Sequence, residues 1–270
     1  MKSILSNKFL ILKYGIEKYL VKNLGIFVPS SSGDYKVLGR ETLKAAHKVF
    51  PLLKKLQEIN HPKVQIKNAE QFCIERKSIL NASILKKLFN KFKSDKSNTH
   101  NYHLIYSSLF KNKDKIKDIL EIGIGTNNTD IISNMGSRGI PGASLRAFKA
   151  YFRYANIYGA DFDKRILFKE KRIKTFYVDQ TDIRTLHSMF FKVKKKFDLI
   201  IDDGLHALHA NLNTVIASLD RLKKGGWLVI EDIPLIALDF WIIVHQILPK
   251  KYITCIIKSK LKIVFLIQKK

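Results

Sequence analysis

The sequence of 270 residues has little cysteine and no long uncharged apolar run. Its two cysteines, Cys73 and Cys255, lie far apart and match no metal-binding or redox spacing. We therefore expect buried thiols in a reducing compartment, the cytoplasm. Charged residues interrupt the apolar N-terminal segment before any run reaches the roughly 20 residues that span a bilayer. Neither a membrane span nor a cleavable signal peptide is expected.

That N-terminal segment, MKSILSNKFLILKYGIEKYLVKNLGIFV, combines apolar residues with lysines. Such a pattern is also typical of a basic amphipathic helix that lies on a membrane surface. Packing against its own protein is the favoured interpretation, and peripheral membrane contact is the alternative.

Acidic residues are scarce, with 23 Asp and Glu against 49 Lys and Arg, and the net charge is +26. A charge of this size attracts nucleic acid or anionic lipid. The lysines, however, are spread along the whole sequence together with many Ile and Asn, and no RNA-binding signature accompanies them. A compositional bias explains the charge better, so nucleic acid is not the expected partner.

The pattern of apolar residues changes along the chain. Residues 1–93 are predicted to be mostly helical, and one helical pattern, GRETLKAAHKVFPLLKKLQEI, is interrupted by Pro51. Residues 94–270 are predicted to form a separate domain, in which strands alternate with helices from Lys117 onward. Five short apolar runs each end near a carboxylate: KDILEIGIG, NIYGADFD, KTFYVDQ, KFDLIIDDG and GGWLVIEDI.

Strands that alternate with helices and are apolar on both faces indicate a parallel sheet covered on both sides. Two further runs, YITCIIKS and LKIVFLIQKK, are close enough to form an antiparallel hairpin at the C-terminus. The predicted fold is therefore α/β, a Rossmann-like sheet of the class I methyltransferase kind, preceded by a mostly helical N-terminal region.

Ligands of open parallel sheets bind beyond the carboxyl ends of the strands. After the first strand, Gly123 and Gly125 would allow a ligand close to the backbone, although two glycines can also mark a simple turn. The phosphate-binding pattern G-x-G-x-x-G is incomplete because position 128 is Asn128. With Glu121 in the same motif, the site suits a cofactor that carries ammonium and sulfonium groups better than a pyrophosphate.

The next two strand ends carry further polar residues. Asp161 could accept hydrogen bonds from two ribose hydroxyls, and Asp179 with Gln180 could recognise an adenine edge. Each residue alone is more often a solvated loop residue. Together, at successive strand ends, they indicate an adenosyl site, and S-adenosylmethionine is favoured over NAD.

Four acids follow the fourth and fifth strands. Asp202 is assigned to the cofactor side, while Asp203, Glu231 and Asp232 are predicted to meet beyond it. Carboxylates from neighbouring strand ends repel one another unless a cation lies between them. Oxygen ligands favour a hard ion, Mg²⁺ first, with Ca²⁺ or Mn²⁺ as other choices. Two unrelated acidic turns are the alternative.

His206 is predicted to lie at the start of the next helix, where the helix dipole disfavours a charged imidazole. A neutral ring beside a cation site can act as general base towards a hydroxyl. His209, three residues on, is interpreted as structural.

These motifs resemble one family. The segments LEIGIGTNN, GASLRAFKAYFRYANIYGADFD, FYVDQTD, IIDDGLH and GGWLVIEDI are similar, in this order, to the Mg²⁺-dependent sugar O-methyltransferases that modify macrolides. The segment SDKSNTHNYHLIYSSLF also resembles a motif that precedes the first strand in that family. The likeness extends from about Ser94 to Asp232.

The resemblance implies that Asp203, Glu231 and Asp232 hold the metal and that His206 is the general base. It also implies that Ser144, Asp161, Gln180 and Asp202 line the cofactor site. Two neighbouring hydroxyls of a sugar-containing acceptor would then chelate the cation, and one would attack the sulfonium methyl group. Leu205 departs from the small polar residue frequent in the family, and residues before about Asn90 show no likeness.

A metal-independent RNA or protein methyltransferase, recruited by positive charge, is the alternative function. The motif DDGLH counts against it, because amino-methylating enzymes often carry Asn-Pro-Pro-aromatic at this place. A scaffold without turnover is a third reading, disfavoured by the intact acids and His206. The acceptor sugar and assembly into a homo-oligomer are open.

Overall fold

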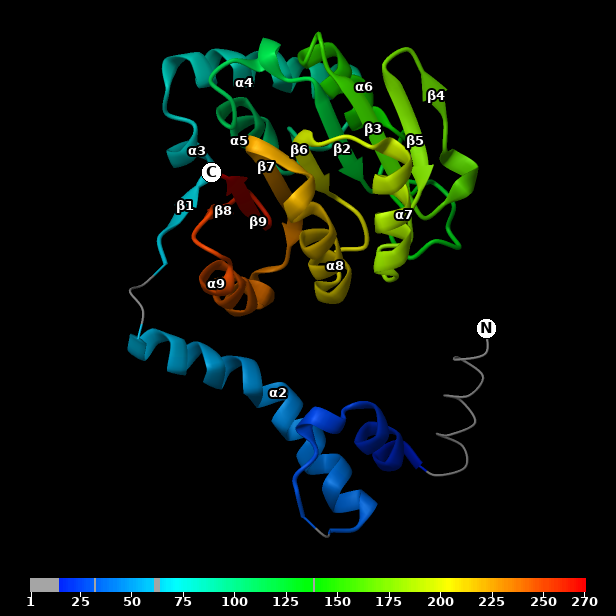
Figure 1. The fold of residues 1–270 in the computed structure, drawn as a ribbon, viewed down its shortest axis with the longest axis vertical. Helices are drawn as coiled ribbons and strands as arrows, with labels where there is room; N and C mark the ends of the chain where they lie inside the picture. Colours follow the sequence, from blue (N-terminus) through cyan, green and yellow to red (C-terminus); the bar gives the residue numbers. More distant parts are fainter. Residues whose placement is uncertain (1–14, 32, 61–63, 138) are drawn as a thin grey trace. The chain divides into compact units, whose positions relative to one another are not determined.

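The computed structural model describes residues 15–31, 33–60, 64–137 and 139–270 (Figure 1). The described residues form two compact units. Residues 15–60 and Asp239–Gln246 belong to one, and Val64–Leu238 with Ile247–Lys270 belong to the other. The first 14 residues of the predicted membrane-surface segment lie outside the described residues.

The smaller unit is helical. Its main element is α2 (Tyr35–Asn60), accompanied by residues 15–23, a short 3₁₀ turn η1 (Gly25–Phe27), and most of α9 (Leu238–Ile247). The predicted interruption at Pro51 is wrong, because α2 continues through it. Proline removes the hydrogen bond to the carbonyl of His47, but His47 is exposed, so water can hydrate that carbonyl.

The larger unit contains a nine-stranded sheet in the order β1-β8-β9-β7-β6-β2-β3-β5-β4. The strands are β1 (Ile66–Asn68), β2 (Asp118–Ile122), β3 (Asn156–Asp161), β4 (Lys169–Glu170), β5 (Ile173–Tyr177), β6 (Phe197–Asp202), β7 (Leu222–Ile233), β8 (Tyr252–Lys258) and β9 (Ile263–Lys269). Strands β7, β6, β2, β3 and β5 run parallel, whereas β9 is antiparallel to both β7 and β8. The predicted parallel sheet with a C-terminal antiparallel hairpin is confirmed.

The chain order creates a switch point between β2 and β6. From β2 the chain continues outward through β3 and β5, and it then returns to β6 on the other side of β2. At such a switch point the loops after the two central strands diverge and leave a crevice at the carboxyl edge. This edge therefore carries the loops after β2, β3, β5, β6 and β7, where the candidate residues lie.

Helices cover both faces of the sheet (Figure 1). The core cluster joins α4 (Arg76–Lys91), α5 (Tyr102–Ser108) and α6 (Ala143–Tyr151) to alternate strand residues such as Ile119 and Val229. On the other face, α7 (Ile183–Val193) contacts β5, and α8 (Leu208–Ser218) contacts β6 and β7. Because strand side chains alternate between faces, Glu121 and Glu231 point to the α5 face.

The remaining elements are short. Helix α3 (Ala69–Phe72) follows β1, and 3₁₀ turns occupy Lys113–Lys115, Lys164–Ile166, Leu219–Arg221 and Leu235–Ala237. None of the helices in the described ranges combines the length and the apolar character that a membrane span requires.

His103 on α5 generates a prediction about stability. It is 8% exposed, and burial lowers the pKa of its imidazole to about 4. The unfolded chain therefore takes up a proton between pH 6.5 and 4 that the folded protein does not take up. Stability must fall as pH decreases through this window, by about 3 kcal/mol from this group. Urea unfolding of wild type and His103→Leu should show this loss only in wild type, and parallel pH curves would contradict the assignment.

Candidate active site

A cavity of about 920 Å³ lies at the carboxyl edge of the sheet. This volume is within the usual range for small-molecule sites. Nine of the predicted site residues line it: Gly123, Gly125, Ser144, Asp161, Asp179, Gln180, Asp203, His206 and Asp232. The other three, Glu121, Asp202 and Glu231, are at most 1% exposed and lie behind this lining.

The glycine loop after β2 is pressed against the turn after β6. Gly123 has a left-handed backbone with φ of +85°, and a Cβ atom there would overlap the carbonyl oxygen of Asp203. The Asp203 amide also donates to the carbonyl of Ile122 at 2.8 Å. The absence of a side chain at position 123 therefore lets the loop after β2 pack against the acidic turn after β6.

Asp161 closes β3 beside this loop. Its two carboxylate oxygens accept from the amides of Ile124 and Asp163, each at 2.9 Å, and burial raises the pKa of its carboxyl group. Each carboxylate oxygen has a second lone pair, so Asp161 can still accept hydrogen bonds from a ligand. This geometry is compatible with the predicted contact to ribose hydroxyls.

The Gln180 side chain organises the turn after β6. Its Nε2 donates to Asp202 at 2.7 Å and to Thr214 at 2.9 Å, while its Oε1 accepts from the Leu205 amide at 2.8 Å. Asn211 on α8 donates to the second oxygen of Asp202. The amide of Gln180 is thus engaged within the protein. Adenine recognition by Asp179 and Gln180 stays a prediction, and so does the contact of Asp202 with the cofactor.

Ser144 and Glu121 form a further buried pair. The Ser144 hydroxyl, in the first turn of α6, donates to Glu121 at 2.7 Å. Burial raises the pKa of the Glu121 carboxyl group, and the ammonium of Lys96, 3.2 Å from it, opposes that effect. Ser144 faces the cavity, whereas Glu121 reaches it only through its neighbours.

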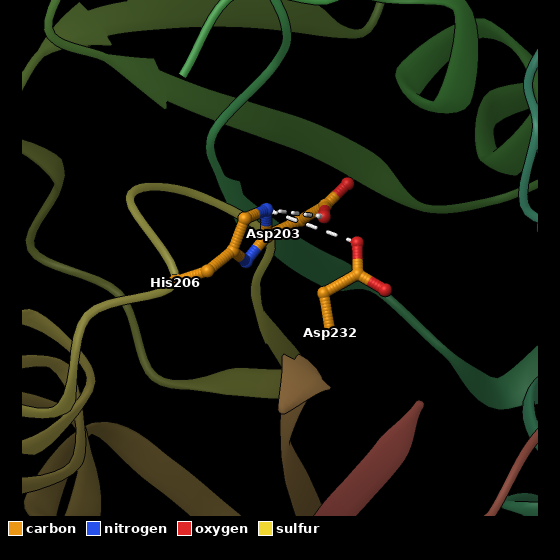
Figure 2. A group of neighbouring side chains, drawn as sticks. All are labelled: Asp203, His206 and Asp232. Atoms are coloured by element: carbon orange, nitrogen blue, oxygen red, sulfur yellow. Dashed lines mark ion pairs between the residues drawn. The ribbon is translucent and has the colours of Figure 1, made fainter. Parts of the chain in front are cut away.

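Asp203, His206 and Asp232 converge on one point (Figure 2). One potential ligand atom from each lies within 4.8 Å of the others. The Nε2 atom of His206 is 3.9 Å from Asp203 Oδ1 and 3.8 Å from Asp232 Oδ2. Two carboxylates and an imidazole can hold a divalent cation, and a hard ion would take the carboxylate oxygens first.

Two members of this group have strained backbones. His206 and Asp232 have φ values of 55° and 53°, in the left-handed region that only glycine adopts without cost. The pairing of β7 with β9 is irregular between Ile230 and Ile233, which spans Asp232. Strain of this kind persists where the surrounding structure maintains it, and it is frequent at functional sites.

The structure does not bring Glu231 into this group. Its side chain points to the α5 face, where Tyr106 donates to one carboxylate oxygen and Lys96 donates to the other. Burial raises the pKa of the Glu231 carboxyl group well above its usual value, although the ammonium of Lys96 opposes this effect. The metal-ligand role of Glu231 stays a prediction.

Sequence reasoning missed Lys96, Tyr102 and Tyr106. All three are buried and bond to the acids at the strand ends. Burial alone would lower the pKa of Lys96, but the charges of Asp203, Glu231 and Glu121 raise it well above its usual value. Burial raises the pKa of both tyrosines, so both hydroxyls keep their protons and donate.

One signal for these residues exists in the sequence. Tyr102 and Tyr106 are four residues apart, so both lie on one face of a helix, and Lys96 precedes Tyr102 by six residues. Several acids at neighbouring strand ends require a compensating positive charge. The sequence contains many lysines that could supply this charge. It does not show which of them lies close to the acids, so Lys96 could not be singled out.

Gly123 provides a test of the contact between the two sides of the cavity. Alanine there should cost about 1–2 kcal/mol in backbone strain and should also displace the turn at Asp203. Gly225→Ala is the matched control, because Gly225 has a φ of +75° with no atom within 4 Å of an added Cβ.

Thermal unfolding should show a loss of stability from backbone strain in both variants, and a further loss in Gly123→Ala from the displaced turn. Calorimetric titration with S-adenosylhomocysteine should show weaker binding only in Gly123→Ala. Equal affinities in both variants would contradict the proposed role of this contact.

No family model matches the chain. Among curated proteins, a tetracenomycin-C rhamnosyl 2′-O-methyltransferase of Streptomyces olivaceus is 32% identical over 142 residues, which cover 52% of this chain and 35% of the relative. Mycinamicin VI 2″-O-methyltransferase of Micromonospora griseorubida is 38% identical over 92 residues, or 34% and 23% of the two chains. Demethylmacrocin O-methyltransferase of Streptomyces fradiae is 35% identical over 92 residues, with the same coverage.

Solved structures show the same fold. The methyltransferase MycE of the mycinamycin biosynthetic pathway, in complex with Mg, SAH and mycinamycin VI, has a TM-score of 0.54 and 25% identity, over 68% of this chain and 53% of MycE. The chain spans about a third or less of the length of the three curated relatives named above. In the aligned part of this chain, the predicted resemblance to sugar O-methyltransferases and the predicted Rossmann-like methyltransferase fold are confirmed.

Proposed function

We propose that this protein transfers a methyl group from S-adenosylmethionine to a sugar hydroxyl with the help of a divalent cation. The convergence of Asp203, His206 and Asp232 at the carboxyl edge supports this function more than any other observation. These three side chains line the same cavity as the glycine loop and Asp161. Methyl donor and acceptor could therefore meet in one cavity, which is the main requirement for this transfer.

The residues present fit a hard divalent cation. Asp203 Oδ1 and Asp232 Oδ2 both face the same point, and both belong to carboxylates that are partly exposed to the cavity. Glu231 is proposed as the third ligand, which requires it to exchange one of its present partners. When bound, Mg²⁺ or a similar ion supplies a Lewis acid that lowers the pKa of an acceptor hydroxyl.

The cofactor is assigned to the other side of the cavity. Gly123 and Gly125 allow a ligand close to the backbone, and Asp161 retains acceptor capacity for ribose hydroxyls. Asp179 and Gln180 are proposed to contact the adenine. Ser144 and Glu121, which share a hydrogen bond, are proposed to belong to the cofactor site as well. The solved relative binds SAH and Mg in a fold of this type, which supports both assignments.

His206 is proposed as the general base. Its Nε2 atom lies within 4 Å of both Asp203 and Asp232, so a hydroxyl that approaches these carboxylates comes within reach of the ring. The imidazole is about one-third exposed and therefore accessible from the cavity. Proton removal by a positioned base contributes about 10²–10⁴-fold to the rates of such reactions.

A sugar is the proposed acceptor because one relative is named for 2′-O-methylation of a rhamnosyl tetracenomycin, and two others are named for O-methylation of mycinamicin VI and demethylmacrocin. Neighbouring hydroxyls of a sugar offer two oxygens of the kind that a hard cation prefers. The group of Asp203, His206 and Asp232 is not needed by a metal-independent RNA or protein methyltransferase, so it disfavours that alternative.

The function is tested by methyl transfer from labelled S-adenosylmethionine to a panel of glycosides and to total RNA. Transfer to a glycoside should require Mg²⁺ or Mn²⁺ and stop with EDTA. Asp203→Asn should reduce it to the EDTA level, and His206→Asn should reduce kcat about 10²–10⁴-fold. Tandem mass spectrometry of the product locates the new methyl group.

His209→Asn is the matched control, because His209 is exposed on α8 and lies outside the cavity lining. This variant should keep wild-type activity. Methylation of RNA at full rate in EDTA would establish the alternative function. If glycoside methylation is unchanged by EDTA and by Asp203→Asn, the sugar acceptor is supported but the role of the cation is refuted.

A further inference from the structure

One short segment supplies donors to the carboxylates at several strand ends. We call residues 96–106 the donor segment. It comprises the turn before α5 and most of α5 itself. Lys96 bonds to Asp203 and Glu231, Tyr102 donates to Asp232, and Tyr106 donates to Glu231. Lys96, Tyr102 and Tyr106 are each at most 2% exposed.

The donor segment is itself tied to the rest of the unit. The Tyr102 amide donates to the Lys96 carbonyl at 2.7 Å, which closes the turn before α5. Asn101 has a left-handed backbone, donates to Glu70 at 2.8 Å and accepts from the Lys260 amide at 3.1 Å. These contacts to α3 and to the β8–β9 turn hold the donors in place.

The donor segment binds one carboxylate oxygen of Asp203, and the other oxygen faces the proposed cation site. Lys96 Nζ lies 2.6 Å from Asp203 Oδ2, while Asp203 Oδ1 faces His206 at 3.9 Å. The same ammonium lies 3.2 Å from Glu121 and also bonds to Glu231. Rotation of Asp203 would break a charge-assisted bond in a buried position, which is costly.

Asp232 shows the same division of its oxygens. The Tyr102 hydroxyl donates to Asp232 Oδ1 at 2.6 Å and accepts from the Asp232 amide at 3.3 Å. His100 stacks on Tyr102 with its Nδ1 atom 3.3 Å from the same Oδ1. The remaining oxygen, Oδ2, faces His206 at 3.8 Å. Both carboxylates thus present their free oxygen to the same point.

We propose that the donor segment positions the cation-binding carboxylates, with Tyr102 fixing the direction in which Asp232 presents its oxygen and Lys96 doing the same for Asp203. These residues are positioning residues that act through the carboxylates. The inference rests on the proposed function, because it assumes a cation between Asp203 and Asp232. Partners of metal ligands that hold a ligand's orientation typically contribute 10–100-fold to metal affinity.

The test is calorimetric titration of the full chain with Mn²⁺, which needs no acceptor sugar and no turnover. Tyr102→Phe keeps the ring and removes the hydroxyl that donates to the Asp232 carboxylate and accepts from the Asp232 amide. Mn²⁺ affinity should therefore fall about 10–100-fold. Affinity for S-adenosylhomocysteine should stay within about twofold, because the cofactor side keeps its contacts. Tyr151→Phe is the matched control, since Tyr151 is 2% exposed and packs on Phe152 in the core.

Tyr106→Phe is a second variant with an intact ring. Loss of its donor lets Glu231 draw Lys96 away from Asp203, and Mn²⁺ affinity should fall about 3–10-fold, the scale of one hydrogen bond. If both Phe variants bind Mn²⁺ as tightly as wild type, the inference is overturned.

Two other outcomes separate the inference from its premise. Equal losses of Mn²⁺ and S-adenosylhomocysteine affinity, with a lowered Tm, would show that the tyrosines only support the fold, and would overturn the inference alone. Wild-type protein that binds no Mn²⁺ would overturn the cation in the proposed function and the inference with it.

Discussion

The site depends on one buried ion pair network. The ammonium of Lys96 is 2% exposed and contacts Glu121 from β2, Asp203 after β6 and Glu231 from β7. Removal of a charged group from water costs several kcal/mol, and the cost is offset only where opposite charges are well placed. Without Lys96, three carboxylates at adjacent strand ends would repel one another, and at least one would be protonated. The network thus allows acids to gather at this edge before any cation binds.

The strands and the cavity edge could be predicted because their causes are local. Short apolar runs that alternate with helices indicate a parallel sheet, and parallel strands bring their carboxyl ends to one edge. That rule predicts one edge for Gly123, Asp161 and Asp203, and the three residues line one cavity. The hairpin of β8 and β9 was equally visible, since only four residues separate its strands. Strand β1 is three residues long and left no comparable signal.

The partners of individual side chains could not be predicted, because they depend on the pleat and on contacts distant in sequence. Adjacent strand residues point to opposite faces, so Glu231 and Asp232 have different surroundings. Nothing in the sequence indicates that the amide of Gln180 donates to Asp202 and Thr214, which lie 22 and 34 residues away. Lys96 reaches Glu231 across 135 residues. No spacing rule connects such positions. The resemblance to sugar O-methyltransferases includes the segment that contains Lys96, but it does not identify the partners of this lysine.

The central claim is that a divalent cation lies between Asp203 and Asp232, beside His206. Crystals grown with S-adenosylhomocysteine and Mn²⁺ provide the most direct measurement, through the anomalous diffraction of manganese. The account predicts one strong anomalous peak within coordination distance, about 2.0–2.6 Å, of Asp203 Oδ1 and Asp232 Oδ2. A cavity that contains the cofactor but shows no peak at these oxygens, or a peak bound elsewhere, would contradict it.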